Sequence, residues 1–239
     1  MSWGCIEGGV LDGSRLSGFR EQARRLVESR FKTVEPWGWG DSRATLLLEF
    51  WHDVINDLGA GPASFVLVYR KPWEVSEAMQ RLGSEPFLEH PEHGSGIWMC
   101  YNRKLLQFCR QHRENAVLVN IDALVLQPER FVALINNRFG TTLRDPLPDE
   151  VHQVESLSTV DGSDPLISLL AATESESINL LSELDREAEI SGAGLWGVTE
   201  YKTRRLRPDG GDPPPGLSVI IPCHDDGGFL VEAVASVER

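Results

Sequence analysis

The chain has 239 residues, of which 41% are hydrophobic and 25% are charged, and its net charge is −13. This composition is typical of a soluble globular protein with one sizeable core. The acidic balance excludes nonspecific nucleic-acid binding, which depends on clustered Lys and Arg. The sequence does not begin with basic residues followed by an apolar run, as a signal peptide does, and it has no apolar run long enough to cross a bilayer. We therefore expect a cytoplasmic protein without a transmembrane segment. Its four cysteines form no CxxC pair, which favours free thiols.

Two amphipathic helices are predicted in the first 60 residues. The first covers residues 16–31, and its apolar positions at helical spacing are Leu16, Phe19, Ala23, Leu26 and Phe31. The second covers residues 44–59 and is expected to end at Gly59, because glycine is the usual residue after a helix C-terminus.

Two short apolar runs predict strands that are buried on both faces. Residues 64–69 read SFVLVY, and residues 116–121 read AVLVNI. Each run is followed by a helix that begins at a proline, Pro72 or Pro128. Because strands and helices alternate with short joins, we expect an α/β fold in which neighbouring parallel strands have helices on both faces.

The second half of the chain changes composition. About twelve acidic residues and a single basic residue lie between residues 146 and 200, with interrupted helical spacing of leucines. The stretch RRLRPDGGDPPP that follows is typical of an extended linker. We therefore predict an α/β domain over residues 1–145, an acidic helical connector over 146–203, a Pro- and Gly-rich linker over 204–215 and a final segment over 216–239.

Arg70 carries the clearest functional signal in the first domain. It directly follows a predicted strand and precedes a helix N-terminus, and open α/β sheets bind ligands beyond the carboxyl ends of their strands. A guanidinium beside unpaired helix N–H groups suits a phosphate. The alternative is that Arg70 ends the strand and pairs with Glu74 or another acid, and the residues alone leave both interpretations open.

Four blocks of sequence resemble the middle and C-terminal part of bacterial sulfotransferases, over about residues 16–140. They are WGWGDSRATLLLEFW, FVLVYRKPWEV, GIWMCYNRKLL and VLVNIDALVLQPERFVALINNRFG. The resemblance implies a P-loop sulfotransferase-like fold and a ligand such as 3′-phosphoadenylyl sulfate or adenosine 3′,5′-bisphosphate. It also implies that Arg70 binds the 3′-phosphate, and that Asp41 and Arg43 match the Asp and Arg of the family's Trp-Gly-Trp-Lys-Asp-Pro-Arg segment.

The chain also departs from this family. Gly40 stands where the family has a lysine, and Ala78 stands where the family has a phosphate-binding serine. Ser76 is the nearest hydroxyl, but it lies half a turn earlier and is expected to point elsewhere. The family's phosphosulfate-binding strand, glycine-rich loop and helix have no counterpart, since residues 9–14, GVLDGS, lack a lysine and follow no strand. We therefore expect an incomplete fold and no sulfuryl transfer by this chain alone.

Histidines and tryptophans give weaker signals. The candidates for a general base are His52, His90, His93, His112 and His152, and none stands out. His90 and His93 share a loop and could ligate a metal, but no third ligand is identifiable, so we predict no metal site. The aromatic residues Trp37, Trp39 and Trp98 either line an acceptor pocket or pack in the core.

Residues 216–239 resemble the first strand and helix of a family 2 glycosyltransferase, a GT-A type domain. Pro222 follows the strand, and His224 and Asp225 occupy the Tyr-Asn positions that lie beside the nucleotide-sugar base in that family. The segment contains no Asp-x-Asp motif, so a nucleotide sugar with a divalent metal is expected only in a complete domain. Because one strand and one helix bury little apolar surface, the segment either docks on the first domain or is mobile, and we favour mobility.

Together the resemblances imply part of a transferase of glycan or cell-surface polysaccharide biosynthesis, inactive as this fragment. It would use a nucleotide donor and a glycan or other hydroxyl acceptor. An alternative is a noncatalytic nucleotide-binding or scaffold module derived from a sulfotransferase, which would explain Gly40, Ala78 and the absent loop together.

Overall fold

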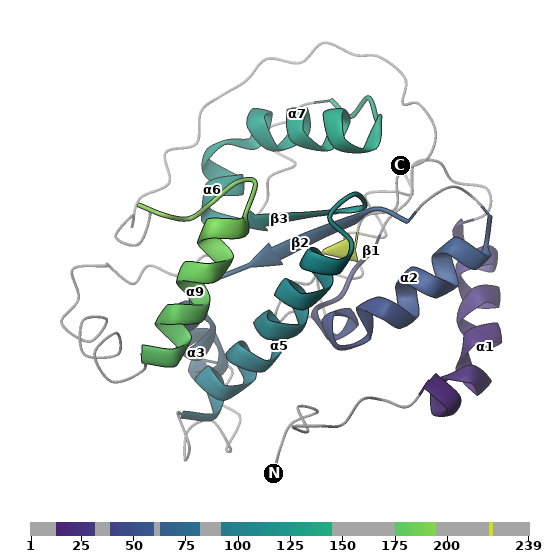
Figure 1. The fold of residues 1–239 in the computed structure, drawn as a ribbon, viewed down its shortest axis with the longest axis horizontal. Helices are drawn as coiled ribbons and strands as arrows, with labels where there is room; N and C mark the ends of the chain where they lie inside the picture. The colour runs from purple at the N-terminus through teal and green to yellow at the C-terminus, as the bar shows by residue number, and fades with distance from the viewer. Residues whose placement is uncertain are drawn as a thin grey trace.

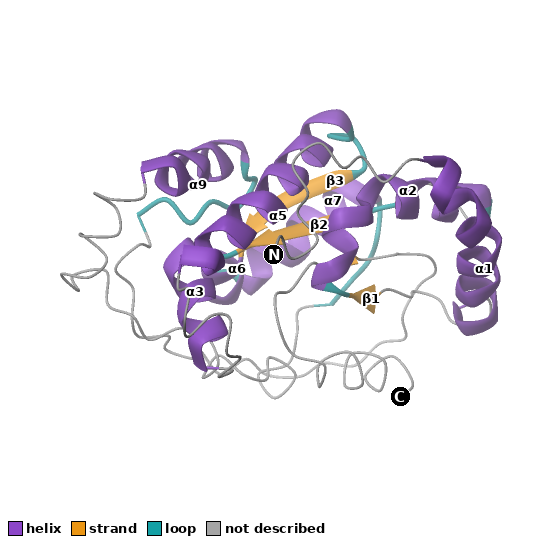
Figure 2. Ribbon diagram, turned by 90° about the horizontal axis from the view of Figure 1, so that it is seen from below, coloured by secondary structure: helices purple, strands orange, loops and turns teal. Residues whose placement is uncertain are grey.

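A computed structural model of the chain is organised around two parallel strands (Figure 1). The strands are β2 (Phe65–Tyr69) and β3 (Ala116–Asn120). The views in Figure 1 and Figure 2 show this pair between α5 on one side and α7 on the other. The residues that the structure describes are 13–31, 39–59, 63–81, 92–144, 175–194 and 220–221.

The central strands have the arrangement expected from their sequences. They pair in parallel, with Phe65 opposite Ala116 and Tyr69 opposite Asn120, and all residues of both strands are buried. The chain crosses from one to the other through α3 (Pro72–Arg81) and α5 (Glu92–Gln111). The prediction of neighbouring, buried, parallel strands in an α/β fold is therefore confirmed.

Each face of the strand pair packs against its own set of helices, because successive side chains of a strand point to opposite faces. Phe65, Leu67 and Tyr69 share one core cluster with side chains of α2, α3, α5 and α9. Val66 and Val68 belong to a second cluster on the other face, with α6 and α7. The bounds not yet given are α2 (Leu48–Asp57), α6 (Ile121–Leu126), α7 (Pro128–Phe139) and α9 (Ser175–Glu187).

The two predicted N-terminal helices are present, but the buried side of the first one differs from the expectation. Helix α1 (Gly13–Phe31) packs on α2, which follows the 3-10 helix η1 (Ser42–Leu47). Phe19 and Leu26, assigned to the apolar face, are 59% and 54% exposed, whereas Ala23 and Val27 are buried. The smaller side chains allow close approach to α2, and Arg20 at the contact pairs with Asp53 of α2.

The segment predicted as an acidic connector contributes to the core. Helix α9 lies against α5, and its Leu181 and Leu184 are fully buried. After α9, Ile190 forms a parallel bridge with Val119, and the backbone N–H of Asn120 donates to the Ile190 carbonyl at 2.8 Å. Residues 175–190 therefore fold as part of the α/β unit.

The final segment is described only at β4 (Ile220–Ile221), which pairs in parallel with β1 (Trp39–Gly40). These two residues meet the backbone of β1, and the mobility expected for residues 216–239 stays a prediction. The linker over 204–215, and the rest of the final segment, lie outside the described residues.

The described cysteines behave differently from one another. Cys109 is a free, buried thiol, and burial raises its pKa to about 11. Cys100 is disulfide-bonded, so the expectation of free thiols is wrong at this position.

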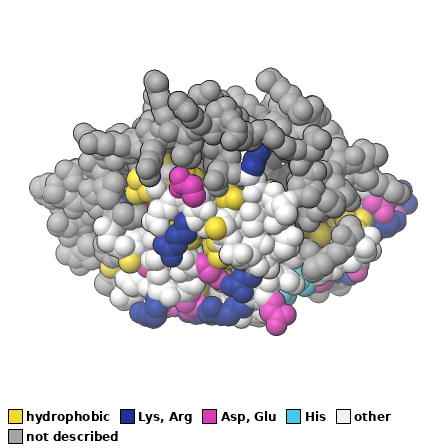
Figure 3. All heavy atoms as spheres, turned by 90° about the horizontal axis from the view of Figure 1, so that it is seen from above, with side chains coloured by type: hydrophobic (Ala, Val, Ile, Leu, Met, Phe, Trp, Pro, Cys, Tyr) yellow, Lys and Arg dark blue, Asp and Glu magenta, His cyan; other side chains and the backbone are white. Residues whose placement is uncertain are grey.

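The described residues bear on the expectations about membrane spans and surface charge. None of the described helices is long and apolar enough to cross a membrane. On the face shown in Figure 3, basic and acidic side chains lie next to one another. The Arg138–Glu189 pair, at 2.9 Å, is another place where opposite charges are neighbours. Such mixing lowers the local field that a nucleic-acid surface requires.

Replacing Leu184 by Ala tests whether α9 belongs to the core. Because Leu184 is fully buried, we expect Leu184→Ala to lower the free energy of unfolding by about 2–5 kcal/mol. The matched control Leu26→Ala removes an exposed leucine and should change it by less than about 0.5 kcal/mol. Urea denaturation followed by circular dichroism measures both, and equal effects would contradict the packing of α9.

Candidate functional site at the carboxyl ends of the strands

Both central strands end in polar residues at the same edge of the sheet. Arg70 and Lys71 follow β2, while β3 ends at Asn120 and leads into Asp122 of α6. Because the strands are parallel and Tyr69 is opposite Asn120, these groups meet at one edge. This is the edge at which open α/β sheets bind ligands.

Lys71 connects the two strand ends through buried ion pairs. Its Nζ lies 2.6 Å from Asp122 Oδ2 and 3.2 Å from Glu74 Oε1, and all three side chains are at least 97% buried. Burial acts to lower the pKa of the Lys71 ammonium, but the charges of Glu74 and Asp122 outweigh it and raise this pKa. Burial, followed by the Asp122 charge, raises the pKa of Glu74. The ammonium is therefore held in its charged form.

Arg70 is the less tightly paired cation of this cluster. Its Nε lies 3.7 Å from Glu74 Oε2, and this Nε is buried without a hydrogen bond to any residue that the structure describes. The side chain remains 18% exposed. The Arg70 carbonyl accepts a hydrogen bond from Trp98 Nε1 at 2.9 Å, which fixes the backbone at this point. The ion pair supports the interpretation of Arg70 as a partner of Glu74. At 3.7 Å, however, the Arg70 Nε–H can still donate a hydrogen bond to another acceptor.

Asn120 joins the end of β3 to the start of α6. Its Oδ1 accepts from the N–H groups of Asp122 and Ala123 at 3.0 and 3.2 Å, which is an N-cap. Its Nδ2 is buried and makes no hydrogen bond within the described part of the chain. A Cβ at Gly192 would lie 2.5 Å from Asn120 Cγ, so only glycine allows this close approach.

A second buried network fixes Gly192 beside the site. The Tyr69 hydroxyl donates to Asp185 Oδ1, and the Gly192 N–H donates to the same oxygen at 3.0 Å. Burial, together with the Asp185 carboxylate, raises the pKa of the Tyr69 hydroxyl well above its ordinary value. The tyrosine is therefore a neutral donor, and it ties α9 and the segment after it to the end of β2.

Asp41 and Arg43 form a local pair at the start of η1. Asp41 Oδ1 accepts from the Arg43 N–H at 2.8 Å, and the Arg43 guanidinium contacts both carboxylate oxygens at 2.7–3.2 Å. Partial burial acts to raise the pKa of Asp41, but the hydrogen bonds from Arg43 lower it below its ordinary value. Within the described residues, no hydrogen bond or ion pair joins this pair to Arg70.

The other residues singled out from the sequence are not brought to the cluster as ligands. Ser76 faces the first turn of α5, since a Cβ at Gly94 would lie 3.0 Å from Ser76 Oγ. Trp98 is 1% exposed, which favours core packing over an acceptor pocket. The residues that lie outside the described part are Trp37, His90, His152, Pro222, His224 and Asp225.

Sequence reasoning missed Lys71, Asp122 and Asn120, although a signal was present. Lys71 directly follows Arg70, and Asn120 and Asp122 directly follow the second apolar run. Charged residues that adjoin two parallel buried strands meet at one edge, so the sequence could have placed Lys71 and Asp122 at the same edge, though not as a pair.

A hollow of about 430 Å³ between α5 and α9 is a second location where a ligand could bind. Its basic and acidic groups pair across it, as Arg110 does with Glu183 at 3.0 Å. A ligand there would have to break exposed ion pairs, whereas the strand edge offers a buried donor without an acceptor.

Breaking the Lys71–Asp122 pair tests the cluster. Asp122→Ala leaves a buried ammonium with Glu74 alone, so we expect the free energy of unfolding to fall by about 3–5 kcal/mol. The double variant Lys71→Met, Asp122→Leu removes both charges and should recover most of this loss. Asp53→Ala, which removes an exposed ion pair, should cost at most about 1 kcal/mol. Denaturant titrations measure all three, and a double variant no better than Asp122→Ala would argue against the pair.

Comparison with models of known families, with curated proteins and with solved structures finds no match.

Proposed function

We propose that the α/β unit binds the 3′-phosphate of a nucleotide such as 3′-phosphoadenylyl sulfate or adenosine 3′,5′-bisphosphate at the carboxyl ends of β2 and β3. The observation that carries the proposal is the buried Arg70 Nε, which makes no hydrogen bond to a described residue. A buried donor without an acceptor is costly, and a phosphate oxygen is a strong acceptor for a guanidinium.

The charges around Arg70 support a phosphate as the missing acceptor. Lys71 is matched by Asp122 at 2.6 Å and by Glu74 at 3.2 Å, whereas Arg70 reaches Glu74 only at 3.7 Å. Arg70 is therefore the cation with most to gain from an added anion. It also lies two residues before Pro72, the first residue of α3, and the dipole of a helix favours negative charge at its N-terminus.

In the whole protein we propose that this unit belongs to a transferase of glycan or cell-surface polysaccharide biosynthesis. The sulfotransferase-like blocks and the family 2 glycosyltransferase-like segment at residues 216–239 support two modules in one polypeptide. Pro222, His224 and Asp225 are proposed for the nucleotide-sugar side of the second module, and a divalent metal would be needed there in a complete domain. The acceptor is proposed to be a hydroxyl of a glycan.

A noncatalytic binding or scaffold module is the second candidate, and specific contacts favour it. Asp41 and Arg43 satisfy each other, and Ser76 is covered by Gly94 of α5. Phosphate recognition would then depend on Arg70 and the start of α3. This candidate keeps nucleotide binding but requires no group transfer.

Calorimetric titration of the full chain with two nucleotides tests the phosphate site. We expect adenosine 3′,5′-bisphosphate to bind about 10- to 100-fold more tightly than adenosine 5′-monophosphate, because only the former carries the 3′-phosphate that Arg70 would contact. Arg70→Ala should remove this preference and leave the affinity for the monophosphate nearly unchanged. Uridine and guanosine diphosphates serve as comparison ligands for the glycosyltransferase-like segment.

The matched control is Arg113→Ala, which removes an exposed arginine that pairs with Glu187. It should keep the preference for the bisphosphate. Equal affinities for the two adenosine nucleotides in the unaltered chain, or a preference that survives Arg70→Ala, would refute the proposed role of Arg70.

A further inference from the structure

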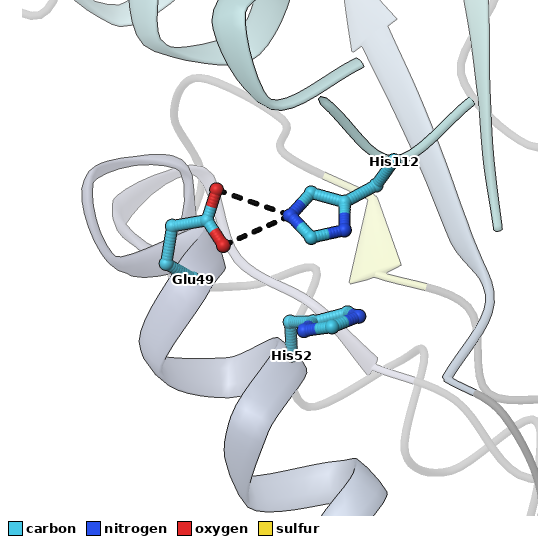
Figure 4. Close-up of side chains that lie close together, drawn as sticks. All are labelled: Glu49, His52 and His112. Atoms are coloured by element: carbon cyan, nitrogen blue, oxygen red, sulfur yellow. Dashed lines mark hydrogen bonds and ion pairs between the residues drawn. The ribbon is translucent and has the colours of Figure 1, made fainter. Parts of the chain in front are cut away.

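Three metal-ligating side chains meet at the opposite end of the strand pair. Glu49 and His52 lie one turn apart on α2, and His112 follows the last residue of α5 (Figure 4). The two carboxylate oxygens of Glu49 lie 2.9 and 3.2 Å from His112 Nε2. One ligand atom from each of the three residues lies within 4.8 Å of the others.

Aromatic packing holds the two imidazoles in place. The rings of His52 and His112 have centroids 4.3 Å apart, and Phe108 lies 4.4 Å from His112. Phe65, the first residue of β2, packs on Phe108 at 4.8 Å and on His52 at 5.9 Å. Both imidazoles are therefore half-buried on a fixed apolar base, which lowers the cost of ordering them around an ion.

The Asn56 amide lies beside the His52 ring. Asn56 Oδ1 accepts from the Ala63 N–H at 3.1 Å, which orients the amide nitrogen toward His52. This Nδ2 lies 3.0 Å from His52 Nε2 and 3.4 Å from His52 Nδ1. Because a metal ligand needs an unprotonated imidazole nitrogen, an ion bound here takes the place of the proton or of the Asn56 contact at the nitrogen that it uses.

The spacing of the three groups suits a transition-metal ion. Bonds of about 2.0–2.2 Å from Zn²⁺ to His nitrogen and carboxylate oxygen place tetrahedral ligand atoms about 3.3 Å apart. Glu49 and His112 are already at this spacing, and a ligand atom of His52 lies within 4.8 Å of theirs. A hollow of about 150 Å³, lined in part by Glu49, Phe108 and Gln111, adjoins the cluster on the side of Glu49.

We propose that Glu49, His52 and His112 bind one divalent ion of the Zn²⁺ class. Two imidazoles with one carboxylate are a donor set that such ions favour over Ca²⁺ or Mg²⁺. The ion ties α2 to the turn between α5 and β3. The site is independent of Arg70, because it lies at the amino ends of the strands, and it departs from the prediction of no metal site.

Titration of the purified full chain with Co²⁺, followed by visible absorption, tests the site. We expect one equivalent to bind with the d–d bands of a four- or five-coordinate ion, and Zn²⁺ to displace it. His112→Ala should weaken binding at least tenfold. Glu49→Gln should also weaken binding while keeping the shape of the side chain, which separates ligation from loss of fold.

His93→Ala is the matched control, because His93 lies near the start of α5, about 28 Å along the helix from His112. It should bind Co²⁺ as the unaltered chain does. The proposal is overturned if no Co²⁺ binds at micromolar concentration, if His112→Ala and Glu49→Gln leave the affinity unchanged, or if a sulfur-to-cobalt charge-transfer band shows that cysteines hold the ion.

Discussion

The buried ion pair between Lys71 and Asp122 is the contact on which the candidate phosphate site depends. It joins the residue that follows β2 to the helix that follows β3, and Glu74 completes it from α3. Buried charges are costly unless each has a partner at short distance, so this cluster fixes the relative positions of three elements. Arg70 is positioned by the same constraint, because Glu74 is shared between the two cations.

The two ends of the central strands have different chemistry, and the apolar strands between them explain why. Five buried residues in each strand leave no place for polar groups along the sheet, so these collect where the strands begin and end. The carboxyl end holds Arg70 and the Lys71 cluster, which suits an anion. The amino end holds His52, His112 and Glu49, which suits a cation.

The helices on the first face connect these two ends. Helix α5 carries Trp98, whose indole N–H holds the Arg70 backbone, and it ends one residue before His112. Helix α9 packs its leucines on α5 and, through Asp185, holds the Tyr69 hydroxyl at the end of β2. The acidic segment after residue 146 therefore helps to shape the candidate site, in addition to its role in the core.

The sequence by itself determined the elements with strong local signals. The two apolar runs predicted the buried strands, and Pro72 and Pro128 predicted helix starts. Arg70 was placed at the carboxyl edge of the sheet because it follows a strand. The spacing of apolar residues, the geometry of proline and the end of a strand are all local properties of the sequence. Only the tertiary structure decided which charges pair. Lys71 with Asp122, and His112 with Glu49, are 51 and 63 residues apart, and no local pattern reports such a distance. The same holds for α1, whose exposed Phe19 and buried Val27 follow from contact with α2 and not from helical spacing.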